Sequence, residues 1–236
     1  MCWGQKGGGA EREGQGIREK GGRSHRNPRH PPLDGRGNGK HDRPEQGQTL
    51  KRLVIAVTGT PGTGKTSFAL ELSKKIGGRL IRLNELVERE RAYTEEGGER
   101  VVKLREMIRA VGRILKETEG PVVIEGHLSH FLPTRYLSHV VVLRTHPKLL
   151  EKRLRERGYP EGKVEDNVEA EALDLILWEA VQRHGEKVYE IDTSKRRNTV
   201  SLFLQALEKG TRLPPGKVRW LEEYLNLKER AGRRKT

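Results

Sequence analysis

The chain has 236 residues and a formal net charge of +14 at pH 7. That length suits one α/β domain or two small ones. No run of 18 apolar residues is present, so we expect no transmembrane helix. The single cysteine, Cys2, allows neither a disulfide framework nor a cysteine zinc site within one chain. We therefore expect a cytoplasmic protein without a membrane partner, whose charge favours nucleotides, RNA or ribosomal surfaces.

The first fifty residues have a composition of their own. Residues 1–50 hold 12 of the 28 glycines and 4 of the 11 prolines, with ten Lys and Arg against six Asp and Glu. So little apolar surface cannot offset the entropy cost of ordering a backbone. We expect a disordered, basic tail without a secretory signal. Alternatively, the segment is a start-site artefact and translation begins near Leu50.

Beyond this tail, short apolar runs alternate with helical stretches. The apolar runs have strand length, and we expect strands at 53–58, 79–83, 122–125, 139–144 and 187–191. The expected helices are 65–76, 84–92, 99–118, 148–157, 168–184 and 199–209. Strands separated by helices of this length form βαβ units and a parallel sheet. The pattern predicts an α/β fold over about 51–210 with a five-stranded parallel sheet.

The end of the chain is again basic. Residues 211–236 carry eight Lys and Arg against three Asp and Glu. The apolar residues fall at helical spacing, which predicts an amphipathic helix that docks on the body or on a partner; they are Val218, Leu221, Tyr224, Leu225 and Leu227.

The segment GTPGTGKT, residues 59–66, matches the spacing G-x-x-x-x-G-K-[ST] between a predicted strand and a predicted helix. Gly62 and Gly64 let the backbone N–H groups turn inward around phosphates, at the positive end of the helix dipole. Lys65 places its ammonium on the terminal phosphates, and the Thr66 hydroxyl is suited to ligate Mg²⁺. This pattern predicts a P-loop NTPase, but it leaves the reaction open.

The sequence after the loop excludes several P-loop classes. A GTPase needs a base-selecting Asn-Lys-x-Asp, which is missing, and a motor ATPase needs more chain. Small kinases remain, and these need an acceptor-binding insertion and a closing lid that excludes water. The charged segment 82–105 fits the insertion, with Asn84, Arg89 and Arg91 as candidates to bind an acceptor nucleotide. The alternative for each is a solvated surface helix.

The sequence VVIEGHLSH supplies two more candidates. Glu125 ends a predicted buried strand, where ligands bind in open α/β sheets. A carboxylate there can order Mg²⁺ through water or accept a proton from the acceptor. His127 points to the same side if the strand continues.

Three arginines precede the loop RGYPEGK. By helical spacing Arg153 and Arg157 share a face and Arg155 is turned away. We expect at least one of them to reach the transferring phosphate, where a fixed guanidinium neutralises developing charge. The alternative is that they are ordinary surface arginines.

Four segments together resemble the adenylate kinase isoenzyme 6 family, from about residue 52 to 210. They are GTPGTGKTS, RLNELVERERAY, VVIEGHLSHFLPTRYLSHVVVLR and LRERGYPEGKVEDNVEAE. The family comprises broad-specificity nucleoside monophosphate kinases and ATPases that also assist small-ribosomal-subunit maturation. Neither flanking segment is covered by the resemblance.

The resemblance implies a three-layer α/β/α fold of the nucleoside monophosphate kinase type, with an acceptor segment from about Arg82 and a lid over about 156–166. The family's acid-x-His pair, linked to ATP hydrolysis and metal handling, falls on Glu125 and His127. Eukaryotic members carry Asp where this chain has Glu125, and their acceptor segment is longer. The implied ATP contacts are Gly62, Gly64, Lys65, Thr66, Ser67 and Arg157.

These features lead to three hypotheses of function. The first is a Mg²⁺-dependent kinase that converts ATP and AMP into two ADP, with Lys65 and Arg157 stabilising the transferring phosphoryl group. The second is an ATP-switched assembly factor that binds a small-subunit ribosomal protein and rRNA, with kinase activity secondary. The third is another small-molecule kinase of the same fold.

Overall fold

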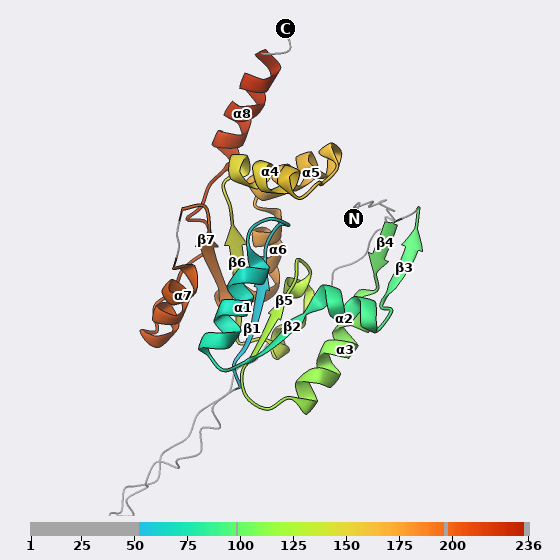
Figure 1. Ribbon diagram of the computed structural model, residues 1–236. Helices are drawn as coiled ribbons and strands as arrows, with labels where there is room; N and C mark the ends of the chain where they lie inside the picture. Colours follow the sequence, from blue (N-terminus) through green and yellow to red (C-terminus); the bar gives the residue numbers. More distant parts are fainter. Residues whose placement is uncertain (1–51, 98, 196–197, 234–236) are drawn as a thin grey trace, which may run out of the picture. The chain divides into compact units, whose positions relative to one another are not determined.

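The computed structural model describes residues 52–97, 99–195 and 198–233, so the expected tail at 1–50 lies outside the described residues. A sheet of five parallel strands in the order β2-β5-β1-β6-β7 forms the centre (Figure 1). All five strands coincide with predicted ones to within a residue or two, and the predicted sheet is confirmed. They are β1 (Val54–Thr58), β2 (Arg79–Arg82), β5 (Val122–Glu125), β6 (His139–Arg144) and β7 (Val188–Asp192).

Helices cover both faces of the sheet and give the three layers that were predicted. One face carries α1 (Lys65–Lys75) and α7 (Thr199–Glu208). The other carries α2 (Leu83–Arg89), α3 (Leu104–Glu117) and α6 (Leu175–His184). Short 3₁₀ helices lie at Ser129–Phe131, Thr134–Tyr136 and Gly185–Lys187.

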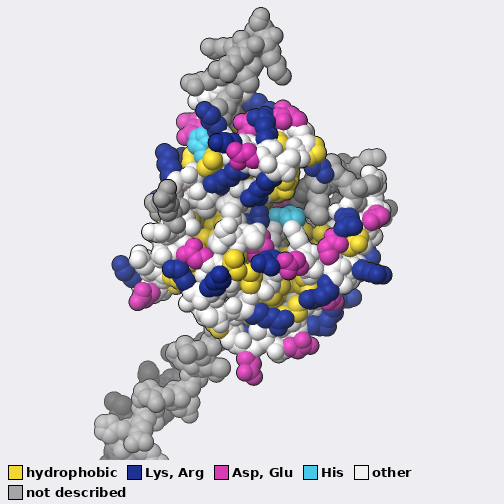
Figure 2. All heavy atoms as spheres, viewed as in Figure 1, with side chains coloured by type: hydrophobic (Ala, Val, Ile, Leu, Met, Phe, Trp, Pro, Cys, Tyr) yellow, Lys and Arg dark blue, Asp and Glu magenta, His cyan; other side chains and the backbone are white. Residues whose placement is uncertain are grey.

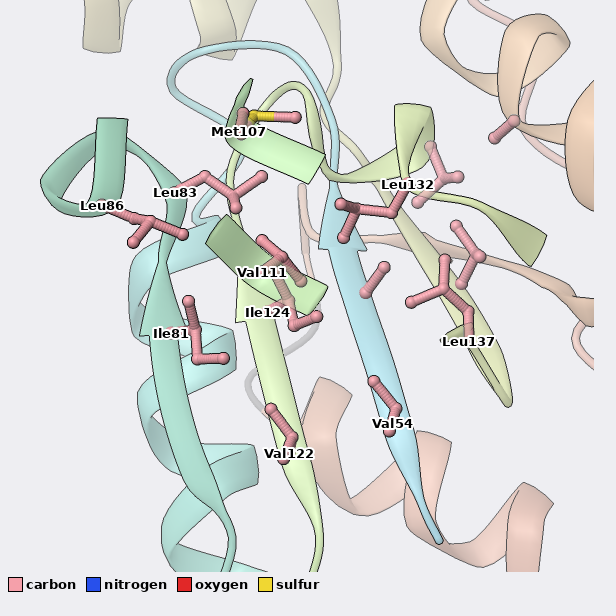
Figure 3. Packing of buried hydrophobic residues seen from close by; sticks show 14 of the residues in the cluster. Val54, Ile81, Leu83, Leu86, Met107, Val111, Val122, Ile124, Leu132 and Leu137 are labelled. Atoms are coloured by element: carbon pink, nitrogen blue, oxygen red, sulfur yellow. The ribbon is translucent and has the colours of Figure 1, made fainter. Parts of the chain in front are cut away.

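Strand β1 shows how the sequence fills both layers. Its residues alternate, so that Val54 and Ala56 join the core under α2, α3 and α6 while Ile55 and Val57 join the core under α1 and α7. This is the two-residue period of a strand covered on both faces. Figure 3 shows the first core, with Val54, Val122 and Ile124 turned toward Val111 of α3. The carboxyl end of β1 is therefore held rigidly where the phosphate loop begins.

A third apolar cluster lies outside the sheet. Helices α4 (Pro147–Glu156) and α5 (Glu161–Ala172) form a pair beyond the carboxyl ends of the strands (Figure 1). Leu150 and Leu154 of α4 meet Val168 of α5, and Tyr224 of helix α8 (Leu221–Arg233) completes the cluster. The C-terminal helix thus begins at Leu221, later than residue 211, and packs on the body of the domain.

Two of the expected helix boundaries are wrong. The helix expected over 99–118 begins only at Leu104, because β4 (Glu99–Val102) forms an antiparallel hairpin with β3 (Tyr93–Glu96), which lies between the two expected helices. Glycine between runs that contain tyrosine, threonine and valine is a hairpin signal, and Gly97 has φ 59°. The helix expected over 168–184 is two helices, because Asp174 takes a left-handed conformation with φ 57°.

Candidate functional site

The phosphate loop runs from Gly59 to Lys65, the first residue of α1. Gly62 and Gly64 have φ 94° and 92°, conformations that residues with a side chain rarely adopt. A Cβ on Gly62 would also lie 2.7 Å from the Leu150 side chain of α4. The loop is therefore shaped by glycine at both positions, and it packs directly against the helix pair above it.

Lys65 is almost entirely buried inside this loop. Its ammonium donates a hydrogen bond to the Thr60 carbonyl, with 3.0 Å between Nζ and O. Burial lowers the pKa of Lys65 to about 8, while the charges of Glu125 and Glu171 raise it and that of Arg157 lowers it further. The side chain still carries its charge at pH 7. Lys65 thus provides a buried positive charge surrounded by the fixed backbone dipoles of the loop, an arrangement that suits the binding of a polyphosphate.

Thr66 and Glu125 meet at the floor of the site. The Thr66 hydroxyl donates to the Glu125 carboxylate across 3.2 Å. Glu125 is the last residue of β5 and lies in register with Val57 of β1 and Arg82 of β2. A hydroxyl and a carboxylate side by side are oxygen donors of the kind that Mg²⁺ prefers, with its other positions filled by phosphate and water. These two residues therefore fit the ion that a P-loop kinase uses.

His127 follows the strand in a loop. The strand does not continue to this residue, because β5 ends at Glu125, so the condition under which His127 would share the side of Glu125 is not met. The pKa of His127 is nevertheless lowered to about 4, first by burial and then by the charge of Lys65. His127 is therefore neutral at pH 7.

A pocket of about 320 Å³ opens beside the phosphate loop. The loop contributes residues 62–64 and Ser67, and α4 and its C-terminal end contribute Arg153 and Arg157. Arg153 donates to the Gly62 carbonyl across 3.2 Å. Arg155 is turned away, as helical spacing predicts, and pairs with Glu151 and Glu161.

Four residues outside the phosphate loop also line this pocket and were not predicted: Phe68, Glu71, Thr193 and Thr199. Thr193 follows β7, and its hydroxyl lies 2.9 Å from the Thr63 carbonyl of the phosphate loop. Polar residues just after a parallel strand mark the ligand-binding edge of an open sheet. That signal was available in the Asp192-Thr193-Ser194 sequence.

A buried ionic network lies behind the loop, and it too was missed. Arg144, at the end of β6, is 1% exposed and pairs with the carboxylates of Glu171, Asp174 and Glu190. The other oxygen of Glu171 accepts a hydrogen bond from the Thr60 hydroxyl of the phosphate loop. Four distant parts of the sequence therefore fix the start of the loop.

The candidate acceptor residues lie on the exposed surface, outside the pocket beside the phosphate loop. Asn84 is exposed in the first turn of α2, and Arg91 is exposed with φ 49°. Arg89 is 63% exposed and contacts Glu90 across 3.5 Å. None of the three lines the pocket beside the phosphate loop. Basic and acidic side chains lie interspersed over the face of the molecule seen in Figure 2.

The segment expected as a lid has a definite structure. It consists of a short turn that contains Arg157 and Tyr159, followed by the first two turns of α5. Arg157 is thereby placed at the rim of the pocket. Whether the segment moves as a lid stays a prediction.

Comparisons with known proteins agree with this geometry. A family model described as an AAA domain matches residues 55–174. A protein named "Putative adenylate kinase" from Pyrococcus abyssi is 40% identical over 174 residues, which cover 73% of this chain and 93% of that protein. A protein of the same name from Methanothermobacter thermautotrophicus is 44% identical over 167 residues, 70% of this chain and 95% of that protein. The chain belongs to this family.

A solved structure supports the fold. The shikimate kinase from Acinetobacter baumannii, determined with shikimate, superposes with a TM-score of 0.52 at 18% identity, over 68% of this chain and 95% of that one. With its fold and its relatives, the family member described here is a nucleotide-binding kinase, that is, a phosphotransferase. In the part of the chain that the structure describes, no helix has the length and apolarity to cross a membrane.

Proposed function

We propose that the protein transfers the γ-phosphoryl group of ATP to AMP or another nucleoside monophosphate, so that ATP and AMP give two ADP. One observation carries the proposal. Thr66 of α1 is bonded to Glu125 of β5 across 3.2 Å directly after Lys65, and Arg157 at the end of α4 lines the pocket beside the phosphate loop. Phosphate-binding, metal-binding and charge-neutralising groups thus converge on one point from three elements.

Lys65 would act on the terminal phosphates of ATP. Its ammonium leaves the Thr60 carbonyl, 3.0 Å away, and moves to the phosphate oxygens as they enter the loop. The Arg157 guanidinium reaches the transferring group from the rim of the pocket. Phosphoryl transfer needs little covalent chemistry from a protein, so positioning and charge neutralisation supply most of the rate.

Thr66 and Glu125 would hold Mg²⁺, the Thr66 hydroxyl directly and Glu125 directly or through water. The ion neutralises negative charge on the phosphate oxygens when it is bound. His127 is neutral at pH 7 because its pKa is about 4. Its imidazole can therefore accept or donate a hydrogen bond and orient the acceptor without adding charge.

The acceptor would lie against the segment 82–105. Asn84, Arg89 and Arg91 would supply two cations and one amide, and they follow β2, the edge strand next to the β5 strand that ends in Glu125. The relatives named "Putative adenylate kinase" match 73% and 70% of the chain, and their name supports AMP as the acceptor.

An acceptor screen tests the proposal. Purified protein is incubated with Mg²⁺, ATP and each nucleoside monophosphate in turn, and ADP formation is measured. We expect AMP-dependent ADP formation that Lys65→Ala lowers by a factor on the order of 10²–10³, as for removal of one transition-state donor. Lys75→Ala, which removes a lysine at the exposed end of the same helix, should leave the rate unchanged. Near-normal AMP phosphorylation by Lys65→Ala would refute the assignment.

The charge of +14 favours a second function beside the first. In this reading ATP binding and hydrolysis change the affinity of the protein for a small-subunit ribosomal protein and rRNA, in the cytoplasm. The discriminating assay is ATP turnover with AMP, without AMP, and with small ribosomal subunits. Turnover that subunits stimulate and AMP leaves unchanged supports the switch. A pull-down at low salt that recovers no small-subunit component counts against it.

A further inference from the structure

The loop that carries His127 is attached to β1 through a buried hydroxyl. Thr58, the last residue of β1, is fully buried and directly precedes the phosphate loop. Its Oγ1 lies 3.2 Å from the His127 carbonyl oxygen. Nearby, Gly126 N–H and the Ser129 hydroxyl both donate to the Val57 carbonyl, at 3.2 and 3.0 Å. The bond at His127 itself comes from Thr58.

A second histidine holds that hydroxyl in turn. His130 Nδ1 lies 2.9 Å from Thr58 Oγ1, and its Nε2 lies 2.9 Å from the Glu179 carboxylate of α6. The ring is 1% exposed and packs against Phe131 with 4.3 Å between ring centres. The His130 carbonyl also accepts a hydrogen bond from His184 Nε2 at 2.8 Å. The ring is therefore fixed by contacts on all sides.

The single N–H of a neutral His130 ring determines which partner donates in each of its two hydrogen bonds. The pKa of His130 is lowered to about 3, mainly by burial, so the ring is neutral and has one N–H. Burial raises the pKa of Glu179 above its ordinary value. In its ionised form this carboxylate requires the N–H on Nε2, which leaves Nδ1 as an acceptor. The Thr58 hydroxyl then donates to Nδ1 at 2.9 Å, with the His127 carbonyl as its longer, second acceptor at 3.2 Å.

We propose that Thr58 and His130 are positioning residues for His127, with Glu179 fixing the tautomer of the His130 ring. The hydrogen bonds from Glu179 of α6 to His130, and from His130 to Thr58, connect the loop that carries His127 to the start of the phosphate loop. This connection holds the backbone of His127 in place before any nucleotide binds. The catalytic importance of these hydrogen bonds rests on the proposed phosphoryl transfer, whereas the placement of His127 can be measured without it.

Two amide substitutions at His130 separate positioning from mere packing. An asparagine ends at the same distance from Cα as Nδ1, so His130→Asn keeps a polar group near Thr58. A glutamine ends near Nε2, so His130→Gln keeps the contact to Glu179 and loses the one to Thr58. Both leave a buried amide of similar polarity, so stability alone does not distinguish them.

The hydroxyl itself has a matched control. Thr58→Val removes the hydroxyl with little change in shape. Ser129→Ala removes a neighbouring buried hydroxyl that bonds to Val57 and not to His127 or His130. The free energy of unfolding is measured for both, so that activity is compared at known stability.

The imidazole ¹⁵N signals of His127 are measured by NMR in the full chain labelled with ¹⁵N-histidine. The kcat and KM of each variant are measured in parallel. We expect Thr58→Val and His130→Gln to shift or broaden the His127 imidazole signals and to lower kcat on the order of tenfold, since small misplacements of a reacting geometry have large effects. KM for ATP should stay within about twofold, because the ATP pocket is lined by other residues. Ser129→Ala and His130→Asn should leave the His127 signals in place.

Unchanged His127 signals in Thr58→Val would overturn the proposal, as would equal effects of His130→Asn and His130→Gln. An Nδ1–H tautomer of His130 in the ¹⁵N spectrum would contradict the assigned role of Glu179. If the wild-type protein phosphorylates no nucleoside monophosphate, the proposed function fails. The NMR comparison would still decide whether Thr58 and His130 place His127.

Discussion

The two halves of the site are built in opposite ways. On the ATP side, Thr60 and Thr63 are at most 1% exposed and Lys65 is buried against them. On the acceptor side, Arg89 is 63% exposed and Arg100 of the hairpin is 52% exposed. Buried, hydrogen-bonded groups have a fixed geometry, whereas exposed ion pairs contribute about 0–1 kcal/mol and order little. The phosphate loop is thus preorganised, whereas the side chains of the proposed acceptor segment would need a ligand to order them.

The largest effect on stability is expected when the buried ionic network behind the phosphate loop loses its arginine. Arg144→Met leaves the buried carboxylates of Glu171 and Glu190 without their cation. We expect a loss of about 3–5 kcal/mol in the free energy of unfolding, measured by chemical denaturation, because uncompensated buried charges are costly. Arg155→Met removes an exposed partner of Glu161 and should cost under about 1 kcal/mol. Equal losses would show that the network does not hold the loop.

The buried ammonium of Lys65 makes stability depend on pH. Its pKa is about 8 in the folded protein against an ordinary value of 10.5. Between these values the unfolded chain binds more protons than the folded one, so the free energy of unfolding rises with pH from about 8 to 10.5. The rise is at most about 3 kcal/mol, since one unit of pKa corresponds to about 1.4 kcal/mol. Denaturation of wild type and Lys65→Met at pH 7.5 and 10 measures it as a difference, and a zero or negative difference contradicts it.

Two neighbouring arginines of the series, Arg155 and Arg157, test where the ATP site ends. Arg157 lines the pocket, whereas Arg155 is paired with Glu151 and Glu161 outside it. Arg157→Ala should lower kcat/KM for ATP about 10–100-fold, by loss of a cation near the transferring group. Arg155→Ala should stay within about twofold. Steady-state kinetics with saturating AMP measure kcat/KM for ATP in both variants. Equal losses in the two variants would show that Arg157 does not act on the transferring phosphoryl group.

The smallest effect on stability is expected on the acceptor side. Arg89 and Arg113 both pair with Glu90 and are similarly exposed, but only Arg89 lies within the segment 82–105. Each change to alanine should alter the free energy of unfolding by about 0.5 kcal/mol or less. Arg89→Ala should raise KM for AMP several-fold without changing the affinity for ATP, and Arg113→Ala should change neither. A rise with Arg113→Ala alone would move the acceptor site to α3.

The same contrast separates what the sequence could predict from what it could not. The strand before the phosphate loop and the loop itself were predictable, because a buried β-branched run and the glycine spacing are local signals. Arg153 and Arg157 followed from helical spacing. The partners of Arg144 were not predictable, because Glu171 and Glu190 lie 27 and 46 residues away and meet it only in the folded chain.

The acceptor half was misread for a different reason. Gly97 lies among charged residues that suit either an exposed helix or a hairpin, and the structure has the hairpin. Little of this segment is buried, so no apolar period could settle the choice. His130 was passed over because a histidine three residues after His127 has no signal of its own until Thr58 and Glu179 are placed beside it.

The most direct test of a site for two nucleotides is the reverse reaction. Purified protein is given ADP and Mg²⁺ as the only nucleotide and ion, and ATP and AMP are measured over time by ³¹P NMR. A phosphotransferase that binds ATP and AMP together must form ATP and AMP in equal amounts from ADP. We expect this in wild type and in Lys75→Ala, and at a rate lowered on the order of 10²–10³ in Lys65→Ala. ADP that persists unchanged, in protein that still hydrolyses ATP, would contradict the account.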